Sequence, residues 1–122
     1  MRYHIAARLA APAAITPMRR YRRFSTANLM TGFLVPGSRM ARSDGACAVL
    51  DGRTVTVHEH GAHLALHLEA PTLAFAEHAA RSLVTILVRD FRELTGWSVA
   101  SCAATITEDE FGALMGSLDS SR

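Results

Sequence analysis

The segment from Ala46 to Glu69 constrains the fold most, because apolar and polar residues alternate along almost all of it. Alternation with a period of two is typical of a β-strand that is buried on one face. Leucines occupy alternate positions of residues 64–68, and histidines flank them. Two turn signals divide the segment, Asp51-Gly52 and Gly61-Ala62. We therefore predict three antiparallel strands, at residues 46–50, 53–60 and 63–69.

The segment after these strands has helical spacing. From Pro71 to Thr95, apolar residues recur at steps of three and four, which is typical of an amphipathic helix that lies on a sheet. Gly96 is a suitable C-terminal stop. Phe75 and Ile86 lie beside the apolar stripe and widen it. Their position predicts either burial under the N-terminal helix or an interface with a partner protein.

The remaining elements flank this central part. Thr16 is a good N-cap and Pro17 suits the first helical position, so a helix is expected to start there. Residues 33–45 have no clear period and contain Pro36 and Gly37, which predicts a mobile loop. The other predicted elements are a strand at 3–9, the end of the first helix near 32, a strand at 97–106 and a closing helix at 107–118.

The order of these elements is β-α-β-β-β-α-β-α. A chain of 122 residues with 49% hydrophobic composition can bury one core, so we expect a single α+β domain over residues 1–122 rather than a disordered chain. The order predicts a ferredoxin-like antiparallel sheet of about five strands with its helices packed on one face. This architecture serves many unrelated functions, so it does not indicate one by itself.

Charge is distributed unevenly along the chain. Residues 1–43 contain eight arginines and no carboxylate, whereas the remaining residues contain five arginines and eleven carboxylates. The sequence therefore predicts a basic N-terminal half and an acidic remainder.

Four of the arginines form a cluster around an aromatic residue: Arg19, Arg20, Tyr21, Arg22 and Arg23. The planar guanidinium group suits phosphates and carboxylates, so the cluster predicts a surface that binds a polyanion such as nucleic acid, or an acidic protein partner. A solvated helix face is the simpler alternative, because no known nucleic-acid-binding motif accompanies the cluster.

Four histidines lie within ten residues: His58, His60, His63 and His67. With Gly61-Ala62 as the turn, His60 would face His63, and His58 would lie diagonally from them on the same face. Such a group could hold zinc, nickel or copper through His58, His60 and His63. A pH sensor and a simple solvated strand face are the alternatives.

The sequence does not predict an enzyme. It contains no nucleophile elbow, zinc-protease motif, phosphate loop or dinucleotide fingerprint, and it predicts no cofactor. Cys47 and Cys102 fall in predicted strands without a CxxC pattern, which favours small buried hydrophobes in a reducing compartment. The apolar stretch Ser82–Val88 is far shorter than the roughly 20 residues of a membrane span. We therefore expect a soluble cytoplasmic protein.

These features together predict a small non-enzymatic module for protein association. It would act as a homodimer or as a subunit of a larger bacterial or phage assembly, since an open edge of the sheet and the uneven charge both favour contact with another copy. The alternatives are nucleic-acid binding through Arg19–Arg23, and metal binding or pH sensing by the hairpin His58–His67.

Overall fold

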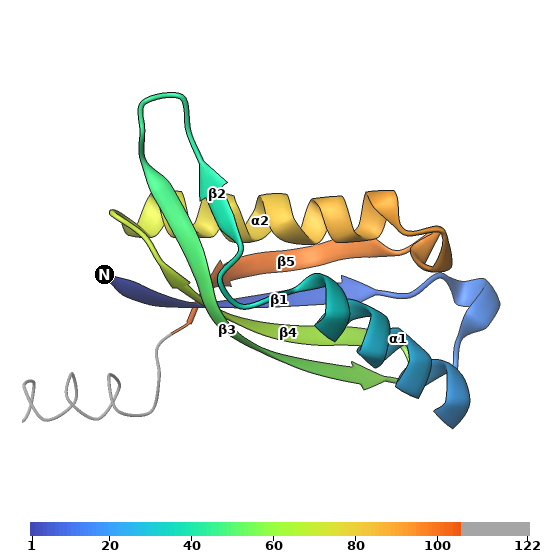
Figure 1. Ribbon diagram of the computed structural model, residues 1–122. Coiled ribbons are helices and arrows are strands. Elements are labelled where there is room, and N and C mark those ends of the chain that lie inside the picture. The colour runs from blue at the N-terminus through green and yellow to red at the C-terminus, as the bar shows by residue number, and fades with distance from the viewer. Residues whose placement is uncertain (106–122) are drawn as a thin grey trace, which may run out of the picture.

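The computed structural model describes residues 1–105 and has an α+β fold, as the sequence predicts. A five-stranded antiparallel sheet curls into a half-barrel with the strand order β2-β3-β4-β1-β5 (Figure 1). The strands are β1 (Arg2–Ala10), β2 (Arg39–Ala41), β3 (Cys47–His58), β4 (Gly61–Glu69) and β5 (Ser98–Ala104). The helices are α1 (Arg20–Phe33) and α2 (Leu73–Asp90), and short 3₁₀ turns follow β1 (η1, Ala13–Ile15) and α2 (η2, Arg92–Leu94).

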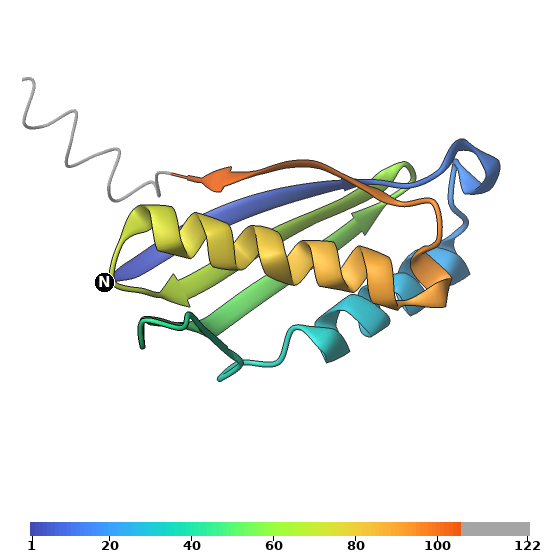
Figure 2. The ribbon, with the colours of Figure 1, turned by 90° about the horizontal axis from the view of Figure 1, so that it is seen from above.

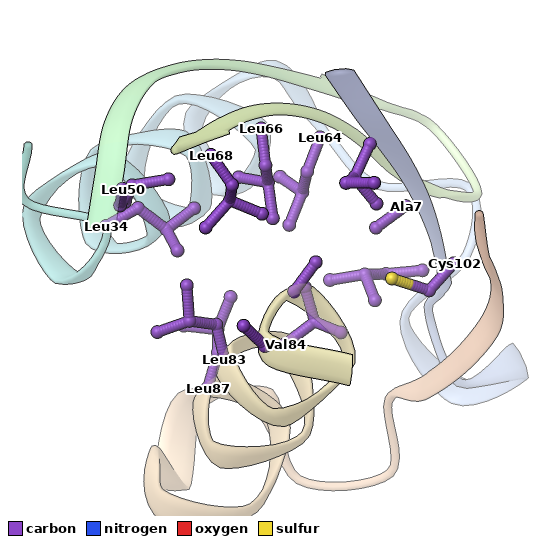
Figure 3. Close-up of a cluster of buried hydrophobic side chains, with 14 of the residues drawn as sticks. Ala7, Leu34, Leu50, Leu64, Leu66, Leu68, Leu83, Val84, Leu87 and Cys102 are labelled. Carbon is purple, nitrogen blue, oxygen red and sulfur yellow. The ribbon is translucent and has the colours of Figure 1, made fainter. Parts of the chain in front are cut away.

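The core lies between the concave face of the sheet and α2, which crosses that face (Figure 2). The three leucines of residues 64–68 are buried, as their alternation predicts, and point toward Leu83, Val84 and Leu87 of α2 (Figure 3). Complete burial of each such side chain stabilises the fold by about 1.5–3 kcal/mol. The apolar stripe of the helix and the apolar face of the strands therefore form one contact.

Helix α1 contacts the sheet through its C-terminal part. Met30 and Leu34 are fully buried, and Leu34 lies beside Leu50 of β3 (Figure 3). The helix begins at Arg20, so the predicted start at Pro17 was wrong. The chain before it stays extended because the Met18 side chain is buried and its N–H donates to the Glu59 carbonyl oxygen at 2.8 Å. Both interactions hold this segment against the sheet instead of in a helical turn.

The Asp51-Gly52 pair does not form a turn, so the hairpin predicted there was wrong. Strand β3 passes through the pair, because Leu50 and Gly52 both lie opposite residues of β4. Asp51 is the extra residue of a β-bulge, and its carboxylate forms an ion pair with Arg2 of β1 at 2.6 Å. The two strands predicted at 46–50 and 53–60 are therefore one long strand.

A different Asp-Gly pair forms the hairpin. Gly45 has a φ of +89°, which favours glycine, and the carboxylate of Asp44 accepts a hydrogen bond from the Ala46 N–H at 3.0 Å. This turn joins β2 to β3. The hairpin that they form projects beyond the rest of the sheet (Figure 1). Strand β2 lies inside residues 33–45, so the prediction of a loop throughout that segment was wrong.

The turn between β3 and β4 also differs from the prediction. Glu59 and His60 form it, since His58 pairs with Gly61, so the turn predicted at Gly61-Ala62 was wrong. Gly61 is the first residue of β4. Glycine is required there because a Cβ atom would overlap the Leu9 carbonyl oxygen of β1. The register moves by an even number of residues, so each side chain keeps its predicted face but changes its partner.

Helix α2 ends at Asp90, earlier than the predicted end at Thr95. The chain leaves the helix at Phe91, whose ring packs edge-to-face against Phe33 of α1 with centroids 5.4 Å apart. Leu94 and Trp97 are buried just beyond it. Burial of these three side chains outweighs the continuation of an isolated helical turn. The closing helix predicted at 107–118 lies outside the described residues.

Among residues 1–105, neither helix combines the length and the apolar character that crossing a membrane requires.

Candidate association surface and histidine face

The N-terminal half of α1 presents an unusual exposed surface, residues Arg19–Phe24, called the α1 patch below. The rings of Tyr21 and Phe24 are 83% and 67% exposed, although side chains of this size are normally at least partly covered. Arg19, Arg20 and Arg22 are exposed beside them. The structure therefore leaves Tyr21, Phe24 and three of the four predicted arginines exposed at the start of α1, while Arg23 is half-buried.

The α1 patch is positively charged. The first turn of α1 contains no acidic residue, and Arg19 at the N-cap makes no side-chain capping hydrogen bond. The N-terminus of a helix is itself positive and favours nearby carboxylates, so this arrangement is unfavourable within one chain. Among the described residues, none of the arginines at 19–23 forms an ion pair.

Two hollows adjoin the α1 patch. One of about 590 Å³ lies between the patch and the segment 14–17, and one of about 310 Å³ lies between the patch and Glu93. Tyr21 and Arg22 line both of them. Tyr21 and Arg22 thus separate two depressions, and side chains of a partner would fit into either of them.

The two residues predicted for an interface on α2 have different environments. Phe75 is buried, and the guanidinium group of Arg42 covers its ring at 4.6 Å from the centroid. Ile86 is half-buried on the outer side of the helix and lines a shallow hollow of about 380 Å³ with Arg81 and Arg89. Of the two, only Ile86 therefore offers apolar surface to a partner.

The predicted histidines lie on or beside the convex face of the sheet, opposite α2. The rings of His58 and His63 are 5.1 Å apart, whereas His60 lies in the turn and its backbone N–H donates to Nδ1 of His58 at 3.2 Å. His63 faces Thr56, so the predicted pairing of His60 with His63 was wrong. The predicted pairing assumed a turn at Gly61-Ala62. The turn lies at Glu59-His60 instead, so the register of β3 against β4 differs from the predicted one.

His67 has a partner that sequence reasoning missed. It pairs with His4 of β1, and the two rings meet edge-to-face with centroids 4.3 Å apart. His4 alternates with the apolar residues Tyr3 and Ile5 in β1, but only the strand order shows that β1 lies next to β4. The convex face thus holds two histidine pairs, one toward each end of β4.

Protonation of His58 and of His67 is disfavoured. Burial lowers the pKa of His58 below its ordinary value, and the charges of His63, His60 and Arg8 lower it further. Burial also lowers the pKa of His67, as do His4 and Arg2, while Asp51 opposes them.

Within residues 1–105, no three histidine, cysteine or acidic side chains come together in an arrangement that could hold a metal ion. The predicted set of His58, His60 and His63 is therefore not assembled as a ligand group.

The cysteines are separate free thiols. Cys102 is buried in β5, and burial raises the pKa of its thiol. A raised pKa disfavours the thiolate that nucleophilic or redox chemistry requires. Its burial makes Cys102 a core residue, in agreement with the sequence prediction, whereas Cys47 is only half-buried.

Comparison of the chain with protein-family models, with curated proteins and with solved structures gave no match.

Proposed function

We propose that this protein is a non-enzymatic association module that forms a homodimer through the α1 patch. The observation that carries the proposal is the exposure of Tyr21 and Phe24 within a cluster of arginines. Aromatic residues and arginine are enriched in protein interfaces, and they supply most of the binding energy there. A solvated helix face would not need two exposed aromatic rings.

Charge complementarity supports a second copy as the partner. Residues 1–43 contain arginines but no carboxylate, and the rest of the chain is rich in carboxylates. Within the described part, Glu59, Glu77 and Glu93 form no ion pair in their own protomer. In a twofold dimer, each basic patch would meet acidic residues of the other protomer, and both contacts would form together.

Light scattering of the purified chain at a series of protein and salt concentrations tests this proposal. We expect a dimer that dissociates on dilution and more readily at high salt, because the contact contains charges. The double variant Tyr21→Ser/Phe24→Ser should be monomeric. Val35→Ser is the matched control, since Val35 is 53% exposed but lies outside the patch. A wild-type chain that is monomeric throughout the series overturns the proposal.

Nucleic-acid binding is a second candidate, and the position of Tyr21 beside Arg22 favours it. Arginines that follow a phosphate backbone and an aromatic ring that stacks on bases are the usual components of a single-strand-binding surface. Fluorescence anisotropy with a labelled single-stranded oligonucleotide tests this candidate. Binding should weaken steeply with salt and be lost when the four arginines at 19–23 become serine. Equal affinity of wild type and variant for the oligonucleotide excludes this candidate.

The ferredoxin-like relationship is also a proposal. Its support is the order β3-β4-β1-β5, in which all neighbours are antiparallel and two helices connect the strands. Strand β2 would then be an addition at one edge. An experimental structure that shows another connection between these strands would refute it.

A further inference from the structure

A hollow of about 230 Å³ opens on the convex face, and it shares no lining residue with the α1 patch. Arg8 of β1 and three histidines of the β3–β4 hairpin, His58, His60 and His63, line it together with apolar residues. Ala10 and Ala100 are small, whereas Leu9 and Ala62 belong to the buried core behind it. Since one water occupies about 30 Å³ in the liquid, the hollow has room for a tetrahedral anion with several waters.

The lining of this hollow matches an oxyanion. It contains no carboxylate, and four of its side chains can donate hydrogen bonds. The guanidinium fork of Arg8 suits two oxygens of one phosphate group. Nδ1 of His58 accepts the N–H of His60, so a neutral His58 carries its proton on Nε2 and presents a donor there.

The walls of the hollow are held in place by backbone contacts. The carbonyl oxygen of His60 accepts the Ala11 N–H at 3.0 Å, and that of Glu59 accepts the Met18 N–H at 2.8 Å. Gly61 packs directly on the Leu9 carbonyl, which fixes the distance between the hairpin and β1. The backbone that carries the donor side chains therefore needs little reorganisation when a ligand binds.

We propose that this hollow binds a small phosphate-class oxyanion between Arg8 and the histidines His58, His60 and His63. This site is separate from the α1 patch, so the inference does not rest on the proposed dimer.

The charges around the hollow predict how binding depends on pH. Burial lowers the pKa of His58 most, and the charged and titratable groups that act on it, His63, His60 and Arg8, lower it further. A bound anion reverses their effect and stabilises the protonated ring. By linkage, the anion binds more tightly as pH falls through the histidine range. Sulfate, whose charge is constant there, separates this effect from the titration of phosphate itself.

Titration with inorganic phosphate, followed by the NMR signals of the histidine rings, tests the proposal. We expect saturable shifts at His58 and His63 that are larger than those at His4 and His67. Arg8→Gln should weaken binding about tenfold or more, because a charge-assisted hydrogen bond is lost. Arg2→Gln is the matched control, since Arg2 lies on the same strand and face outside the hollow. His63→Gln and His67→Gln form a second matched pair.

Three results would overturn the proposal: no saturable shift in wild type, equal shifts at both histidine pairs, or unchanged affinity in Arg8→Gln. Loss of binding in Arg20→Gln would also do so, because it would place the anion on the α1 patch. Vesicles that contain phosphatidic acid distinguish a lipid headgroup from a free ligand. If the protein binds these vesicles through Arg8 but does not bind free phosphate, the proposal that the ligand is a free anion is refuted. The wild-type shifts decide the question even if Arg8→Gln does not fold.

Discussion

The guanidinium carbon of Arg42 lies 4.6 Å from the centre of the Phe75 ring. Arg42 belongs to the β2–β3 turn and Phe75 to the first turn of α2, so the contact joins the projecting hairpin to the helix. Arg42 also forms an ion pair with Asp44 at 2.8 Å within the turn. The second interaction orients the guanidinium group that covers the ring.

Arg42→Ala is therefore expected to lower the free energy of unfolding by about 0.5–1 kcal/mol, the usual contribution of a partly exposed cation–π contact. Urea denaturation followed by the fluorescence of the buried Trp97 measures it. The same substitution in a Phe75→Leu background should have a smaller effect, because the ring is absent. An equal effect in both backgrounds would show that Arg42 acts only through Asp44.

Gly61→Ala is expected to destabilise the protein by about 1–3 kcal/mol or more, as overpacking does, since its Cβ would overlap the backbone of β1 at Leu9. Gly32→Ala is the matched control. Gly32 lies in α1 with no atom near its missing Cβ, and alanine there should stabilise the helix by about 0.5–1 kcal/mol. Thermal unfolding of both variants should show opposite shifts, and shifts of the same sign would contradict this packing.

Thr72→Ala is expected to cost about 0.5–2 kcal/mol, because the Thr72 hydroxyl caps α2 by accepting the Phe75 N–H at 3.2 Å. Thr85→Ala provides the comparison, since Thr85 is exposed within the same helix, where alanine has the higher helix propensity. Chemical denaturation should show a loss of stability for the first variant alone.

We expect the protein to lose stability in mild acid because of two histidines on the convex face. His58 and His67 have a lower pKa in the folded chain than their ordinary value of 6.5, so folding favours the neutral rings. Their contribution is present above about pH 6.5 and is lost as the pH falls through the lower folded values. Urea denaturation at several pH values should show this decrease.

The double variant His58→Gln/His67→Gln should reduce that pH dependence. His78→Gln removes a histidine from the outer side of α2 and is the control for the substitution itself. If the decrease is as steep in the double variant as in wild type, other groups cause it.

The sequence predicted the faces of the strands better than their ends. The alternation from Ala46 to Glu69 identifies the buried leucines, because burial acts on every second residue whatever the register. The two Asp-Gly pairs have the same local turn preference, at Asp44 and at Asp51. Only the pairing of residues on both sides of Asp51 with β4 decides between them, and that pairing is a tertiary property.

The candidate sites likewise include features that local sequence predicts and features that depend on the order of the strands. The arginine cluster and Tyr21 follow from local sequence, since a helix with no buried residue in its first two turns exposes them wherever it lies. The partnership of His4 with His67 and the approach of Arg8 to His58 need the neighbouring position of β1 and β4. That neighbourhood joins residues about 60 positions apart, which no local pattern specifies.

The turn at Glu59 and His60 lies between the two proposed surfaces. The His60 side chain lines the anion hollow, and the Glu59 carbonyl holds Met18 just before α1 begins. An anion that restricts this turn would restrict the start of the helix as well. If the proposed anion alters the affinity of the proposed dimer, thermodynamic reciprocity requires the dimer to alter the affinity for the anion by the same factor. The β3–β4 turn would then link occupancy of the proposed anion site to the proposed association of two chains.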